Sequence, residues 1–280
     1  MYDKKTILVI NDNSTAAIHA AEYAFLLAQN VNANIVLANT MASKESAVAI
    51  SPASFNDEEI LEEQRFSIIA DHLLGINVSE SGFRPGIKET DISNANECKL
   101  AELINRNKVW MIVKGTSAPV TEADEVQKLK VHIVLNKIAC PLLLIPEHCP
   151  VKIIDRMIYI SDLRYFRMEI IRYLVKLARV CKADLSVAHL TAKGLPDMSE
   201  EYALNIFTED ICRNVNYDRL FFNKIKEKDF TTAVDVMING MQNDMLVFVN
   251  HHFHIEEILG GYDTKLHMPT ITVPQLIFPY

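Results

Sequence analysis

The sequence predicts an α/β protein built from two doubly wound, Rossmann-like parallel-sheet domains in tandem. The first observation is an alternation of short apolar runs with segments of helical periodicity, giving the order β-α-β-α-β-α-β-α-β between residues 6 and 146. The second is that the rest of the chain repeats residues of this part in the same order. A repeat of this length indicates two similar domains rather than a solenoid. We place them at residues 1–147 and 151–280, the second shorter and more diverged.

The first half opens with a strand over Thr6–Ile10 and a helix over Ala16–Val31, which Asn13 or Ser14 is placed to cap. A second strand follows over Ala33–Ala38. The next elements expected are a helix capped at Asn56 and ending near Leu74, a weaker strand over Phe83–Thr90 that Pro85-Gly86 marks as an edge or a bulge, and a helix from an Asn94–Glu97 capping box to Arg106.

The stretch from residue 109 to 146 organises this half. Val109–Val113 has the composition of a buried strand, which we expect to break at Gly115. A polar, acidic loop over Ser117–Glu125, a helix over Val126–Ala139 and a buried strand over Pro141–Ile145 follow. In an open parallel sheet, the loop after such a strand lies where ligands bind.

The repeat is visible as residues matched at a nearly constant spacing. Five pairs lie 150 positions apart (173 − 23, for example): Tyr23 and Tyr173, Ala28 and Ala178, Ala33 and Ala183, Ala42 and Ala192, and Asp12 and Asp162. The spacing falls to 138 for Ile87–Asp91 against Ile225–Asp229, and to 133 for Pro141 against Pro274. The residues lost from the second copy correspond mainly to positions 40–82 of the first.

Composition and charge exclude several classes of function. The net charge of −8 argues against nucleic acid or an anionic membrane as partner, because both need clustered positive charge. The chain has no signal peptide and no apolar span of membrane length, so we expect a cytoplasmic protein. Five cysteines without a Cys-x-x-Cys pair indicate reduced thiols, and Cys140 is expected to be a small apolar filler.

Two short motifs carry a family resemblance. The first strand ends in Asn11-Asp12-Asn13-Ser14, and the last strand of the first half is entered through Cys140-Pro141. Both resemble universal stress protein domains, and the repeat makes the chain similar to a tandem member of that family. The resemblance implies two adenine-nucleotide-hydrolase-like domains, with Asp12 and Asp162 near the place of an adenine. The other interpretation of these two residues is a turn-forming Asp after a strand.

Family members that bind ATP carry the motif Gly-x2-Gly-x9-Gly followed by Ser or Thr, whose backbone N–H groups approach the phosphates. Here Gly115, followed by Thr116, is the first position, but Ala118 and Lys128 replace the other glycines. Pro119 removes one N–H donor. The loop also carries carboxylates that repel a triphosphate: Glu122, Asp124 and Glu125.

The second copy has also lost the motif, because Asn250 replaces the first glycine and Tyr262 follows Gly261 at the third. We therefore expect neither domain to bind ATP in the family manner, and we assign no cofactor. The candidate ligand-binding residues are Asp12, Ser14, Gly115, Thr116, Asp162, Asn250 and Gly261.

A group of histidines follows the fourth strand of the second copy. On an extended segment His252 and His254 share a face, and Glu256 is a third potential ligand, whereas His251 points the other way. Exposed loop histidines are the alternative, so we assign no metal. No catalytic motif of the Gly-x-Ser-x-Gly, His-Glu-x-x-His or Walker type occurs, which leans against an enzyme.

Three functions follow from these observations. The first is a stress-associated binding or regulatory protein that does not use ATP in the family manner. The alternatives are a nucleotide-binding universal stress protein, and a metal-dependent hydrolase that uses the histidine-rich cleft. The apolar final strands, Pro141–Ile145 and Pro274–Phe278, need partners at their edges. We expect them to pair with each other in an intramolecular pseudo-dimer, with a homodimer as the alternative.

Overall fold

The computed structural model describes residues 5–40, 68–76, 82–93, 95–117, 135, 137–192, 194–227, 230–249 and 271–279. Of the helix expected over Val126–Ala139, only residues 135 and 137–139 fall within these ranges. The cap expected at Asn56 lies outside them.

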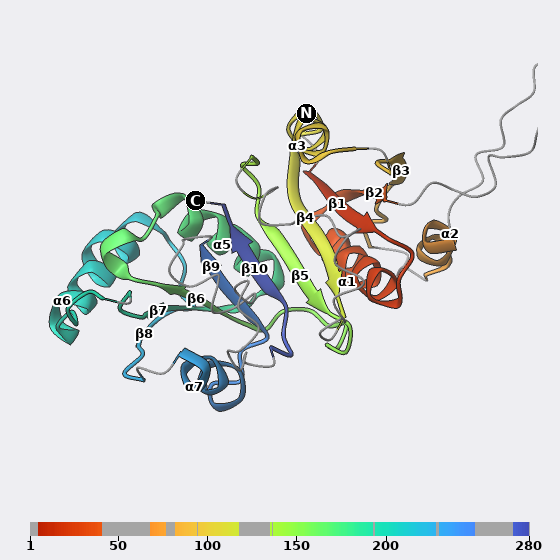
Figure 1. Ribbon diagram of the computed structural model, residues 1–280. Helices are drawn as coiled ribbons and strands as arrows, with labels where there is room; N and C mark the ends of the chain where they lie inside the picture. Colours follow the sequence, from red (N-terminus) through yellow and green to blue (C-terminus); the bar gives the residue numbers. More distant parts are fainter. Residues whose placement is uncertain are drawn as a thin grey trace, which may run out of the picture.

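The strands within these ranges form one ten-stranded sheet in the order β3-β2-β1-β4-β5-β10-β9-β6-β7-β8 (Figure 1). Each half has the same order, with its first strand beside its fourth, so each is a doubly wound unit as predicted. The first half supplies β1 Lys5–Asn11, β2 Ala33–Asn39, β3 Ile87–Asp91, β4 Val109–Thr116 and β5 Leu142–Pro146. The second supplies β6 Arg156–Ser161, β7 Asp184–His189, β8 Leu220–Lys224, β9 Met245–Val249 and β10 Gln275–Phe278.

Helices cover both faces of the sheet (Figure 1). One face is covered by four helices, α1 Thr15–Val31, α2 Ile68–Gly75, α5 Met168–Cys181 and α6 Glu200–Asn205. These helices pack on a continuous apolar core that spans both halves. The opposite face has two separate cores, one under α3 Glu97–Arg106 and one under α7 Phe230–Asp235. Helix α6 continues as a π-helical segment over Ile206–Ile211, and α7 does so over Val236–Gly240.

Helices α1 and α5 are the matching central helices of the two halves and contact each other. Ser14 caps α1, since its side chain accepts a hydrogen bond from the Ala17 N–H. Both helices end in a left-handed residue, Asn32 at φ 54° and Lys182 at φ 56°, again 150 positions apart. The repeat read from side-chain identities is therefore also a repeat of backbone conformation.

The halves join through their final strands. β10 pairs antiparallel with β5, with Ile277 opposite Leu142 and Gln275 opposite Leu144. All other strand pairs in the described sheet are parallel. The two apolar final strands, which would otherwise form exposed sheet edges, therefore lie inside the sheet and are hydrogen-bonded to each other.

Two local predictions were wrong and one was confirmed. β4 does not break at Gly115 but continues through it to Thr116, paired with β5. The cap of α3 is Asn96, whose side chain accepts from the Lys99 N–H at 2.9 Å, and not Asn94. β3 begins directly after Gly86 and is an edge strand, as its Pro-Gly pair predicted.

Within the described ranges, none of the helices combines the length and the apolar character that a membrane crossing requires.

Candidate functional site

Each half has a switch point between its first and fourth strands, β1 and β4 in one and β6 and β9 in the other. Ligands of open α/β sheets bind at the carboxyl ends of the strands on either side of such a point. Five of the seven predicted residues lie there: Asp12 and Ser14 after β1, Gly115 and Thr116 at the end of β4, and Asp162 after β6. Asn250 and Gly261 lie outside the described residues.

The turn after β1 is held by its own amides. The buried Asn11 side chain donates to Asn39 Oδ1 at 2.7 Å and accepts from the Asn13 N–H at 2.9 Å. Asn13 has φ 59°, a left-handed conformation that Asn tolerates better than most residues. The backbone of this turn is therefore fixed before any ligand arrives. We call the predicted ligand positions at the switch points of the first and second half the first cleft and the second cleft.

Asp12 and Ser14 form a closed pair within this turn. Asp12 Oδ1 accepts from the Ser14 hydroxyl at 2.5 Å and from the Ser14 N–H at 3.1 Å. The Ser14 hydroxyl oxygen in turn accepts from Ala17 N–H at 3.1 Å. The Ser14 hydroxyl therefore donates to Asp12 and caps α1. The other oxygen of Asp12, Oδ2, accepts no hydrogen bond from the described residues.

Gly115 has a packing reason to be glycine. A Cβ on Gly115 would lie 2.1 Å from the Ala16 carbonyl oxygen and 2.4 Å from its carbon. β4 thus crosses the first turn of α1 at a distance that no side chain permits. The close approach is to the protein's own helix, so this glycine is by itself no sign of a phosphate loop.

A carboxylate of the protein lies at the start of α1, where the helix dipole favours an anion. The Thr15 hydroxyl donates to the carboxylate of Glu147, in the turn after β5. The Glu147 N–H donates to the Thr116 carbonyl at 3.0 Å, and the Thr116 hydroxyl donates to the Ile145 carbonyl at 3.4 Å. Thr116 is thus tied to β5, and Glu147 holds negative charge at the helix end. Glu147 was not among the ligand-binding residues predicted from the sequence.

The matching aspartate of the second half, Asp162, is saturated by protein donors. Arg164 binds both carboxylate oxygens, Nε to Oδ1 at 2.8 Å and Nη2 to Oδ2 at 2.6 Å. Backbone N–H groups of Arg164 and Ala192 add bonds of 3.1 and 2.9 Å. Burial opposes ionisation of Asp162, but these hydrogen bonds outweigh it and lower the pKa of the carboxyl. Asp162 therefore has no acceptor site to spare.

His189 lies beside Asp162, at the end of β7, and is 1% exposed. Its Nδ1 accepts from the Leu163 N–H at 3.3 Å, and its Nε2 lies 3.5 Å from the Thr191 hydroxyl. Burial lowers the pKa of His189, against the opposing charge of Asp162, so the ring is neutral at pH 7. Neither His189 nor Arg164 was predicted from the sequence. The one available signal was that His189 matches Asn39 at the spacing of 150.

The histidine-rich segment cannot be placed, because His251, His252 and His254 lie outside the described residues. Within the described ranges, no group of three or more His, Cys, Asp or Glu side chains is arranged to hold a metal ion.

Two doubly wound units joined edge to edge, each with a switch point between its first and fourth strands, define a tandem α/β protein. No family model matches the sequence, and no curated protein does either. The fold is similar to that of a universal stress protein from Archaeoglobus fulgidus, with TM-score 0.55 and 11% identity over 98% of this chain and 97% of that one. A putative universal stress protein from Pseudomonas aeruginosa gives TM-score 0.50 and 12% identity over 98% and 93% of the two chains.

The chain therefore has the fold of these universal stress proteins, as the sequence motifs implied. The same fold is similar to the cytoplasmic domain of a prokaryotic cation chloride cotransporter, with TM-score 0.52 and 12% identity over 98% of this chain and 95% of that one. Since one fold occurs in such different proteins, function must be argued from the site.

Proposed function

We propose that this chain is a stress-associated binding and regulatory protein of the universal stress type, and that neither cleft binds ATP in the family manner. The observation that carries the proposal is the ion pair between Asp162 and Arg164. An arginine within the same turn uses both carboxylate oxygens on which a nucleotide would depend.

The energetics of this ion pair favour a closed second cleft. The Asp162 side chain is 4% exposed and that of Arg164 is 24% exposed. A ligand that took over the carboxylate would first have to break a bidentate, charge-assisted pair, which is among the strongest protein hydrogen bonds. It would also leave the Ala192 N–H without its acceptor, at a further cost of about 1–3 kcal/mol if that group stayed buried.

The first cleft is closed by charge. Glu147 lies at the start of α1, so a polyphosphate there would meet a carboxylate at the helix end that normally attracts it. The sequence after β4 adds three carboxylates, those of Glu122, Asp124 and Glu125. Repulsion from the protein's own charge therefore supports the absence of ATP binding in this half.

A nucleotide in the first cleft is the second candidate, and one observation favours it. Among the described residues, Asp12 Oδ2 has no donor, in contrast to Asp162. A neutral donor such as an adenine amino group or a ribose hydroxyl matches that acceptor. This candidate differs from the first in requiring Asp12 for binding.

We further propose that the protein acts in the cytoplasm through protein contacts or a small ligand other than ATP. All five cysteines are free, which is usual in a reducing compartment. The histidine-rich alternative, a metal-dependent hydrolase, has no support among the described residues.

Calorimetric titration with ATP and Mg²⁺ tests the proposal on wild-type protein, Asp12→Asn and Asp71→Asn. Asp71 is an exposed carboxylate on α2 and serves as the matched control. We expect no saturable heat in any of the three, corresponding to a Kd weaker than about 1 mM. Micromolar binding by the wild type and the control that Asp12→Asn removes would overturn the proposal in favour of the nucleotide-binding candidate. Gly115 variants are unsuitable here, because they disturb the packing of α1.

A further inference from the structure

A hollow lies away from both clefts, at the opposite ends of β1 and β4, where the halves meet. Its volume is about 620 Å³. Antiparallel pairing of β5 with β10 places the end of β10 beside the start of β5 there, and α5 begins at the same level. Sites for small organic molecules typically measure about 300–1,000 Å³. The cavity is therefore large enough for a metabolite.

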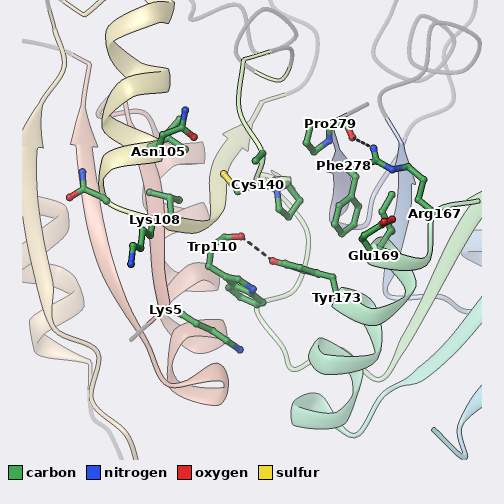
Figure 2. A pocket seen from close by; sticks show the side chains of 16 residues that line it. Lys5, Asn105, Lys108, Trp110, Cys140, Arg167, Glu169, Tyr173, Phe278 and Pro279 are labelled. Atoms are coloured by element: carbon green, nitrogen blue, oxygen red, sulfur yellow. Dashed lines mark hydrogen bonds between the residues drawn. The ribbon is translucent and has the colours of Figure 1, made fainter. Parts of the chain in front are cut away.

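Aromatic rings from both halves form a wall of this cavity (Figure 2). Trp110 of β4 stacks on Tyr173 of α5 with centroids 5.0 Å apart and an interplanar angle of 16°. Tyr173 meets Phe278 of β10 edge to face at 5.2 Å and donates its hydroxyl to the Trp110 carbonyl at 3.2 Å. Each ring is held by its neighbour, so the wall is already formed without a ligand.

Basic side chains border the same cavity, although the chain as a whole is acidic. Lys5 Nζ lies 4.5 Å from the centroid of the Trp110 ring, and Arg167 Nη1 donates to the Pro279 carbonyl at 3.3 Å. Neither Lys5 nor Arg167 has a carboxylate partner among the described residues. Lys108 is a third cation on the lining, against one carboxylate, that of Glu169. Burial, and then the nearby charge of Lys176, lower the pKa of Lys5.

The equivalent place beside Tyr23, in the first half, is filled by protein. Tyr23, the counterpart of Tyr173, is 3% exposed, and the connection between the halves runs past it. The space left there, bordered by residues 152–154, is only about 10 Å³, and Ile154 is 2% exposed. A single connection can fill only one of two equivalent hollows. The hollow beside Tyr173 is the one that it leaves open.

From this geometry we propose that the cavity beside Trp110, Tyr173 and Phe278 binds a small organic acid. The acid's apolar body would lie against the aromatic and proline side chains, and its anionic group would be held by Lys5 and Arg167. Cys140 lies on the lining as a neutral thiol, because burial raises its pKa to about 12. A neutral thiol is a poor nucleophile, so Cys140 has no covalent role in this proposal. A ligand seated there contacts both halves at once.

Trp110 is the only tryptophan, so its fluorescence reports on this cavity alone. The probe is the aromatic sulfonate 8-anilinonaphthalene-1-sulfonate, which accepts energy from tryptophan and combines an apolar body with one anionic group. We expect one saturable site per chain, with a Kd on the order of tens of micromolar and quenching of Trp110 emission. Octanoate should displace the probe, and the neutral analogue octanol should do so far less well.

Two charge-removing variants, Arg167→Gln and Lys5→Gln, should each weaken binding about tenfold, as expected for loss of a charged hydrogen-bond partner. The control is Arg172→Gln, which removes an exposed arginine of the same helix outside the cavity and should leave the Kd unchanged. Near-ultraviolet circular dichroism on each variant verifies the fold. Absence of probe binding, binding without quenching of Trp110, or equal affinity in all three variants would each disprove the site.

Discussion

The close approach of β4 to α1 makes Gly115→Ala the most direct test of the fold described here. The new Cβ would start 2.1 Å from the Ala16 carbonyl oxygen, and real Cβ atoms essentially never come within 3.0 Å of another atom. The helix must therefore move away by about 1 Å, and the obstacle is backbone, which no rotamer change removes. Nine residues of α1 are buried in the core that the halves share, so the displacement cannot stay local.

Overpacking of this kind typically costs about 1–3 kcal/mol, and we expect the upper end for a helix so extensively buried. Alanine also restricts the unfolded chain more than glycine does, which stabilises the folded state by about 0.4–1 kcal/mol. The net decrease in the free energy of unfolding is then about 2 kcal/mol. For a chain of this size the loss corresponds to a decrease of about 4–8 °C in Tm.

The assay is thermal and urea unfolding of Gly115→Ala beside the matched control Gly75→Ala. Gly75 ends α2, and a Cβ there meets nothing within 4 Å, so the control should stay within about 1 kcal/mol of the wild type. If both variants unfold at the same temperature, the interpretation of Gly115 as a packing glycine is wrong. Its absence of a side chain would then need another explanation, and the phosphate-loop interpretation would regain weight.

Two further predictions concern pH. The pKa of Asp162 is lowered from 3.8 in the folded protein, so the ionised carboxyl stabilises the fold above that value, and this contribution is lost as the pH falls through the folded pKa. In urea unfolding at pH 7, Asp162→Asn should lower the free energy of unfolding by about 1–3 kcal/mol, and the difference from wild type should shrink below pH 3.8. Because the pKa of His189 is lowered from 6.5, the unfolded chain binds its proton first, so wild-type stability should fall as the pH drops below 6.5. His189→Gln should remove that part of the slope, and an unchanged slope in the variant would contradict the burial of a neutral imidazole.

The layout of the fold could be predicted because its signals are local. The apolar run after Lys108, for example, needs only its own composition to be recognised as a buried strand, and Ser14 caps α1 through a neighbour three residues away. The end of β4 was misplaced for the opposite reason. A glycine within a strand usually marks a break or a bulge. Here a glycine is required at position 115 because Ala16, about a hundred positions earlier in the chain, leaves no room for a side chain.

The side chains that occupy the two clefts could not be predicted from the sequence. The loss of the second and third motif glycines from the first copy was visible, but the protein groups that bind Asp162 and Thr15 were not. Arg164 looks like an ordinary turn residue until its guanidinium is seen on both oxygens of Asp162. Glu147 meets Thr15 only because β5 ends beside α1, a contact between residues 132 positions apart. Contacts of this range depend on the finished packing, which composition and periodicity do not contain.

Duplication gives a chain two copies of every feature, but a single connection makes the copies unequal. The connection after β5 brings Glu147 to the start of α1 and Ile154 beside Tyr23, so it occupies two places in the first half at once. In the second half, Arg164 instead binds both carboxylate oxygens of Asp162. The hollow beside Tyr173 has neither kind of occupant among the described residues. A ligand that acts on this protein by changing how the halves meet would therefore bind at their junction, because a ligand in either cleft contacts one half alone.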